Sequence, residues 1–210
     1  MSGLTAYEAR RRAGDTAVET GGELWGHTRV LPTGERLHYI ELATVSVFAK
    51  RTPSSIADYA EEYRVKRAFM GKMRPELCLL GDFHTHPYDN LTKVKQEEGW
   101  RSSPNDRDFW RGADEHWASS ANHPVFLVLA LCPIQRVRGS EESVFYNNIR
   151  RFDVANYRFW LNAVVGKIMK SGKRGVTRST NSSVVLDPLP LNLATLRGER
   201  LHDADPIQQG

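Results

Sequence analysis

Cysteine is scarce in this chain of 210 residues, which contains only Cys78 and Cys132. The two form neither a CxxC pair nor a disulfide framework, so the sequence excludes a disulfide-stapled scaffold. Each lies in an apolar run, and we expect both thiols to be buried in strands. No window reaches the roughly 18 uninterrupted apolar residues of a membrane span, and the first fifteen residues lack the apolar core of a signal peptide. These absences predict a protein of a reducing cytoplasm with no membrane partner.

Neither sign of charge dominates the chain. Its 29 Lys and Arg residues against 25 Asp and Glu residues give a net charge of +4. Nucleic-acid binding requires basic residues clustered on a stripe or patch, and no such cluster is evident, so a nucleic-acid partner is not expected. A hydrophobic content of 40% with 26% charged residues is ordinary for a globular domain.

Hydrophobic periodicity predicts strands and helices in mixed order along the chain, which indicates an α/β or α+β domain with a mixed β-sheet flanked by helices. Residues 88–101 are polar and aperiodic and predict a loop, and the segment after residue 170 is basic and predicts a flexible region. We expect strands at residues 23–30, 37–49, 77–86, 124–133 and 142–154, and helices at residues 4–13, 56–73, 103–118 and 156–170.

Two histidines at the end of a predicted strand are the first sign of chemistry. His84 and His86 are separated by one residue, so their side chains point to the same face and can converge on one ion. A catalytic zinc site needs a third protein ligand and an open position. Asp106 is the best third ligand, because Ser103 caps a predicted helix and a carboxylate in its first turn is favoured by the helix dipole. Asp108 is the competing carboxylate.

Three short motifs then occur in order: E-T-G-G-E-L-W-G at residues 19–26, H-T-H-P at 84–87 and S-P-N-D at 103–106. Together they resemble the JAB/MPN domain with its JAMM metal motif, in the form found in prokaryotic members. The resemblance covers roughly residues 15–155. It implies a JAB1/MPN-like fold, related to cytidine deaminases, and a zinc metalloprotease activity.

The resemblance also implies a role for each matching residue. His84, His86 and Asp106 become the zinc ligands, Glu19 the general base, and Ser103 the hydroxyl that stabilises the oxyanion. These roles are chemically consistent, since zinc activates a water and polarises a carbonyl, and a nearby carboxylate can accept the water's proton.

Two assignments have competitors nearby. Glu23 also lies near the first strand, but Glu19 has the spacing to Gly22 and Gly26 that the family pattern requires. Ser102 could replace Ser103 if the register differed by one residue, although the S-x-x-D spacing favours Ser103.

The stretch between the second and third motifs is longer than the compact family pattern by roughly nine residues. This insertion, at about residues 88–101, is charged and contains Trp100. It can be a lid or docking element beside the metal, since long ordered loops near sites are often functional, or a solvated surface excursion. We expect a metallopeptidase domain over residues 1–165, with this insertion, and a basic, loosely ordered C-terminal extension over residues 166–210.

By resemblance, such hydrolases cut peptide or isopeptide bonds after the C-terminal tail of a ubiquitin-like protein, in precursor processing or deconjugation. Related prokaryotic enzymes act in sulfur-transfer or antiviral defense conjugation systems, so E1- and E2-like conjugation proteins are expected partners. The alternatives are a catalytically silent MPN scaffold that binds partners, a RadC-like DNA-associated protein, and a peptidase of small peptides or cell-wall amides.

The remaining aromatic and histidine residues predict packing rather than chemistry. We expect Trp25, Trp110, Trp117 and Trp160 in the core. The remaining histidines have no paired spacing and are expected at the surface or in the core: His27, His38, His116, His123 and His202.

Overall fold

The structure is a computed structural model that describes residues 18–46, 50–52, 55–57, 60–135, 143–177 and 184–186. The helix expected at residues 4–13 lies outside the described residues, and so do His202 and most of the expected C-terminal extension.

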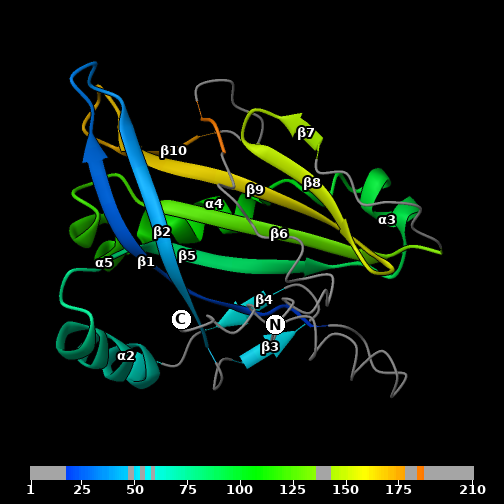
Figure 1. The fold of residues 1–210 in the computed structure, drawn as a ribbon, viewed down its shortest axis with the longest axis horizontal. Helices are drawn as coiled ribbons and strands as arrows, with labels where there is room; N and C mark the ends of the chain where they lie inside the picture. The colour runs from blue at the N-terminus through cyan, green and yellow to red at the C-terminus, as the bar shows by residue number, and fades with distance from the viewer. Residues whose placement is uncertain are drawn as a thin grey trace, which may run out of the picture.

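One mixed β-sheet dominates the described structure (Figure 1). Its strands are ordered β2-β1-β5-β6-β9-β8-β7, and β10 (Arg174–Val176) pairs with the end of β9. The pair β5 and β6 is parallel, and the other ladders of this sheet are antiparallel. The strands span β1 (Gly21–Val30), β2 (Arg36–Val45), β5 (Cys78–Pro87), β6 (Val125–Pro133), β7 (Ser143–Tyr146), β8 (Ile149–Val154) and β9 (Tyr157–Ile168).

Parallel strands need a long crossover, and the crossover from β5 to β6 carries three short helices: α3 (Leu91–Gln96), α4 (Pro104–Gly112) and α5 (Asp114–Ser119). Before β5 come the two-stranded ladder of β3 (Lys50–Thr52) and β4 (Ser55–Ala57) and then α2 (Ala60–Met73). The predicted α+β class with a mixed sheet flanked by helices is confirmed. The crossover also brings the start of α4 to the end of β5, where the histidines lie.

The four tryptophans predicted in the core are buried there, each 3% exposed or less. Trp25 packs with Met70 of α2 and Leu79 of β5, so α2 is anchored on β1 and β5. Trp110 of α4 stacks on Phe126 of β6 with ring centroids 4.7 Å apart. The two cysteines differ from expectation: Cys132 is buried, whereas Cys78 is exposed at the first position of β5.

The helix predicted at residues 156–170 is wrong, because this segment forms β9. Its aromatic and β-branched residues, including Tyr157, Phe159, Trp160 and Val164, favour a strand. The strand pairs with β6 on one side and β8 on the other, and most of its residues are buried. Apolar residues on both faces hide the two-residue alternation that marks a half-buried strand. β9 passes through the expected domain boundary at residues 165 and 166, and β10 continues the same sheet.

Other predicted boundaries need smaller corrections. The single strand at 142–154 is a hairpin of β7 and β8, the helix at 103–118 divides into α4 and α5 at Ala113, and the helix predicted from residue 56 begins at Ala60. The predicted loop at 88–101 contains α3, capped by the side chain of Asn90. A helix this short shows too few periods to be read from sequence.

Candidate metal centre

His84 and His86 lie side by side near the carboxyl end of β5, as the strand period predicts. Their Nε2 atoms are 3.0 Å apart, and their ring centroids are 4.9 Å apart. Both side chains are largely buried, with 8% and 11% of their side-chain surface exposed. Two imidazole nitrogens therefore face one small volume at the edge of the core.

Asp106 brings a carboxylate to the same volume from the first turn of α4. One oxygen, Oδ1, is 3.4 Å from His84 Nε2, and Oδ2 is 3.7 Å from His86 Nε2. Ser103 begins the helix as its N-cap and Pro104 occupies the first helical position, a local sequence that fixes where α4 starts. The competitor Asp108 points away, because its side chain is 74% exposed and pairs with Arg111.

The three side chains fit a metal ion by geometry. Their ligand atoms all lie within 4.8 Å of one another, and we call His84, His86 and Asp106 the metal group. A tetrahedral zinc with bonds of about 2.0–2.1 Å separates its ligand atoms by about 3.3 Å, and the separations here are 3.0, 3.4 and 3.7 Å. Two nitrogens and one oxygen are donors that zinc accepts. Three protein ligands leave a further position for water or substrate.

Electrostatics hold this group in a form suited to binding a cation. Burial raises the pKa of Asp106, but contacts with His84 and His86 and the backbone N–H of Ser103 outweigh it and hold that pKa well below its usual range. Burial lowers the pKa of His86, but Asp106 and the Gly99 carbonyl outweigh it and raise that pKa above its ordinary value. A carboxylate between two imidazoles stays ionised and attracts a positive charge, whether that is a proton or a metal ion.

Glu19 lies beside this group at the entry to β1. The N–H of Thr20 donates to Thr85 Oγ1 at 2.8 Å, and the N–H of Thr85 donates to the carbonyl of Thr20 at 2.7 Å. Gly21 pairs with His84 in the ladder, so the antiparallel register places Glu19 opposite His86. Glu19 is 7% exposed. Burial raises its pKa to about 7, against the attraction of His86 and together with the repulsion of Asp106.

Glu23, the competing base, is buried in β1 and has other partners. It is 2% exposed, its carboxylate accepts a hydrogen bond from Thr44 Oγ1 at 2.6 Å, and it pairs with Lys66 of α2 at 3.0 Å. Glu23 therefore joins α2 to the sheet. The carboxylate beside the histidines is that of Glu19.

Ser103, rather than Ser102, is the residue beside the metal group. Its Oγ accepts a hydrogen bond from the N–H of Asp106 at 3.1 Å, which leaves the hydroxyl hydrogen able to donate elsewhere. Ser102 is 3% exposed and its carbonyl accepts from Arg107 at 2.7 Å, so it supports the loop before α4.

Two contacts that support the histidines were not predicted from the sequence. The N–H of His86 Nδ1 can donate to the carbonyl of Gly99 at 2.9 Å, and Trp110, whose ring centroid is 5.7 Å from that of His84, donates from Nε1 to Asp82 Oδ1 at 3.0 Å. A sequence signal exists for Asp82 alone, since it lies two residues before His84 and shares its face of β5.

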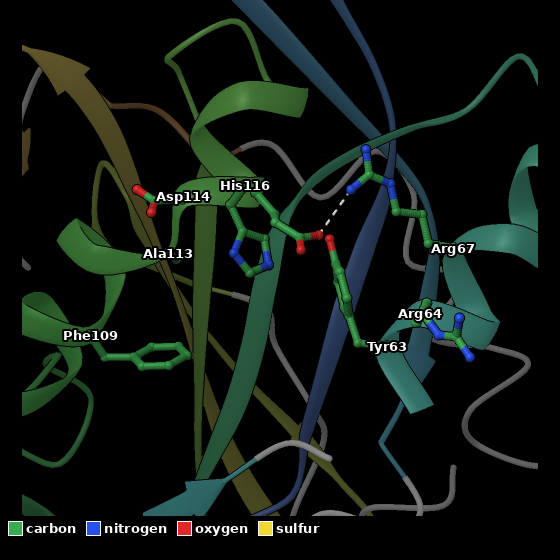
Figure 2. A pocket seen from close by; sticks show the side chains of 8 residues that line it. Tyr63, Arg64, Arg67, Phe109, Ala113, Asp114 and His116 are labelled. Atoms are coloured by element: carbon green, nitrogen blue, oxygen red, sulfur yellow. Dashed lines mark hydrogen bonds and ion pairs between the residues drawn. The ribbon is translucent and has the colours of Figure 1, made fainter. Parts of the chain in front are cut away.

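A cavity of about 420 Å³ lies elsewhere, between α2 and the α4–α5 region. Figure 2 shows Tyr63 of α2 and His116 of α5 on its walls. Arg67 donates to the carboxylate of Glu115, another lining residue, at 2.9 Å. None of the metal-group residues lines this cavity, so it is distinct from the candidate centre.

No protein-family model matches the chain, and no curated protein matches it. Among the described residues, no helix is both long and apolar enough to cross a membrane. The arrangement of His84, His86, Asp106 and Glu19 is the feature of the described structure that bears on function.

Proposed function

We propose that this chain is a JAB/MPN-type zinc metallopeptidase, which hydrolyses the amide or isopeptide bond after the C-terminal tail of a ubiquitin-like protein. The observation that carries the proposal is the convergence of three motifs separated in sequence: His84 and His86 from β5, Asp106 from α4, and Glu19 at the entry to β1. The two cysteines are free, in keeping with work in a reducing cytoplasm.

Each residue has a defined task in this proposal. His84, His86 and Asp106 hold the zinc ion, which lowers the pKa of a water molecule and polarises the substrate carbonyl when it is bound. Glu19 accepts a proton from the attacking water and delivers it to the leaving amine. Burial raises its pKa to about 7 in the metal-free site, and a bound cation would favour the ionised carboxylate, which is the form that accepts a proton.

Ser103 completes the arrangement from the start of α4. Because its Oγ accepts the N–H of Asp106, its own hydrogen is available to the oxygen that becomes negative in the transition state. The fixed cap reduces the reorganisation needed during the reaction. Hydrogen-bond donors of this kind typically contribute about 10²–10³ in rate.

The proposal is tested by cleavage of a ubiquitin-like protein that carries a peptide extension after its C-terminal tail. We expect the wild type to release the extension and Glu19→Gln to lose at least about 10²-fold in kcat. Glu23→Gln is the matched control, because Glu23 lies four residues further along the chain and is also buried, but is engaged with Lys66. It is expected to keep its activity. Equal activity of Glu19→Gln and wild type would overturn the assignment of the base.

A further inference from the structure

The segment at residues 88–101 is built into the core beside the metal group. Val94 is fully buried and Trp100 is 8% exposed, and the Trp100 ring lies 6.0 Å from that of Trp160 on β9. Val94 and Trp100 belong to one buried cluster with Trp160, Ala130 and Ile149. A solvated excursion would not bury these side chains, so the segment has a fixed place against β6, β8 and β9.

The last turn of this segment touches a metal ligand directly. The carbonyl of Gly99 lies 2.9 Å from His86 Nδ1, within hydrogen-bond distance. A proton on Nδ1, donated to this carbonyl, leaves Nε2 as the lone-pair nitrogen that faces His84 and Asp106. The position of one backbone carbonyl thus sets both the ring orientation and the nitrogen that is offered to a metal.

A side chain at position 99 would meet the Tyr88 ring. A Cβ on residue 99 would lie 2.3 Å from atoms of the Tyr88 ring, a distance that requires the turn or the ring to move. The turn is also fixed by the N–H of Gly99, which donates to the carbonyl of Val94 at 2.9 Å. Glu98, immediately before, has a positive φ of 48°, a conformation that the surrounding contacts must maintain.

A buried asparagine holds the next carbonyl of the same turn. Asn162 of β9 donates from Nδ2 to the carbonyl of Trp100 at 2.9 Å. Its Oδ1 accepts from Asn148 Nδ2 at 2.9 Å, which fixes the amide so that its N–H groups face the turn. Both asparagines have no exposed surface. A buried amide pair with its partners arranged in this way is costly to break and rigidifies its surroundings.

We propose that Asn162 is a positioning residue for the metal centre: by holding the Trp100 carbonyl, it fixes the Gly99–Trp100 turn and thereby the His86 imidazole. Residues 88–101 then hold the His86 side chain in position through the Gly99 carbonyl. The inference rests on the proposed zinc centre and extends it to a residue that touches none of the ligand atoms.

The test is the zinc affinity of purified, folded variants, measured by competition with a chromophoric chelator. Asn162→Leu keeps the size of the side chain and removes the donor, and Gly99→Ala forces either the turn or the Tyr88 ring to move. We expect each to bind zinc about 10–100-fold more weakly than the wild type. The absorption bands of the cobalt-substituted variants are expected to shift, because the geometry at His86 changes.

Phe152→Leu is the control for a general loss of stability. Phe152 is buried on β8 and stacks on Phe159, on the face of the sheet opposite to Asn162. The Phe152→Leu substitution should lower the unfolding temperature and leave the zinc affinity and the cobalt spectrum unchanged. If Asn162→Leu and Gly99→Ala bind zinc within twofold of the wild type, the positioning role is wrong while the metal centre stands. If the wild type binds no zinc, the metal centre itself is wrong, and the inference falls with it.

Discussion

Ser103 and Asp106 hold each other at the start of α4. The N–H of Asp106 donates to Ser103 Oγ at 3.1 Å, and the N–H of Ser103 donates to Asp106 Oδ2 at 2.5 Å. This capping box satisfies two N–H groups that a helix start leaves without partners. The same two residues supply the proposed third ligand and the proposed oxyanion donor, so the helix start and the site are one structure.

Substitutions of Ser103 should therefore separate capping from catalysis. Ser103→Asp keeps a capping oxygen but offers no hydroxyl hydrogen, so we expect near wild-type stability with about 10²-fold lower kcat. Ser103→Ala should lose the same activity and about 1 kcal/mol of stability. Ser103→Thr is the control that keeps both functions. Urea unfolding and cleavage kinetics measure the two effects, and full activity of Ser103→Ala would contradict the oxyanion role.

Glu19→Gln should stabilise the metal-free protein in a pH-dependent manner. Burial raises the pKa of Glu19 from 4.5 to about 7, so the folded state favours the protonated carboxyl. Stability is lost as pH rises between these values, because the buried group must ionise, and the loss is complete above about pH 7. Glutamine carries no such cost.

We expect the unfolding free energy of Glu19→Gln to exceed that of the wild type by about 1–3 kcal/mol at pH 8, and the difference to shrink toward pH 5. Glu23→Gln should instead lower the unfolding free energy, because it removes a carboxylate partner of Lys66. Thermal unfolding in the presence of a chelator at the two pH values is the measurement. An offset for Glu19→Gln that is the same at both pH values would contradict the raised pKa.

Zinc should raise the stability of every variant that retains the three ligands. At a free zinc concentration of about 1,000 times Kd, binding to the folded state adds about 4 kcal/mol. The wild type and Glu19→Gln are expected to show this increase, and a chelator should reverse it. Asp106→Ala should show none, since it lacks one ligand. A zinc-dependent shift in Asp106→Ala equal to that of the wild type would place the ion elsewhere.

Trp110→Phe should weaken the packing of α4 on the sheet. The substitution keeps an aromatic ring over Phe126 but removes the hydrogen bond from Nε1 to the buried Asp82 carboxylate. Leaving a buried acceptor without its donor costs about 1–3 kcal/mol. Trp25→Phe is the comparison, because the bond from Trp25 to the Thr44 hydroxyl is only partly buried and its loss should cost less. Urea unfolding of both variants measures the two losses of stability. We expect the larger loss for Trp110→Phe, and equal losses would contradict this expectation.

The motifs made the candidate site predictable because its parts obey local rules. The i, i+2 spacing puts His84 and His86 on one face of a strand, and the sequence of Ser103 and Pro104 fixes where α4 begins. Both rules act within a few residues, so they can be read without knowing the fold. The convergence of Asp106 with the histidines is the long-range part of the prediction, and the structure brings these residues together.

The parts that escaped prediction depend on tertiary context. The sequence of β9 is predicted as a helix because a strand with apolar residues on both faces lacks the polar–apolar alternation. Its pairing with β6 and β8, which the local sequence does not reveal, makes it a strand. The contact of Gly99 with His86 uses a backbone carbonyl, which has no sequence signature. Asn162 acts across 62 positions of the chain, and nothing in its neighbours indicates a partner.

The measurement that tests the central claim most directly is the zinc content of the purified chain, beside His84→Ala and Glu19→Gln. The account predicts about one zinc per wild-type chain, none in His84→Ala, and one in Glu19→Gln, which should nonetheless fail to cleave an extended ubiquitin-like protein. A wild type that binds no zinc when the metal is supplied would contradict the account and would favour an MPN-like scaffold that binds protein partners.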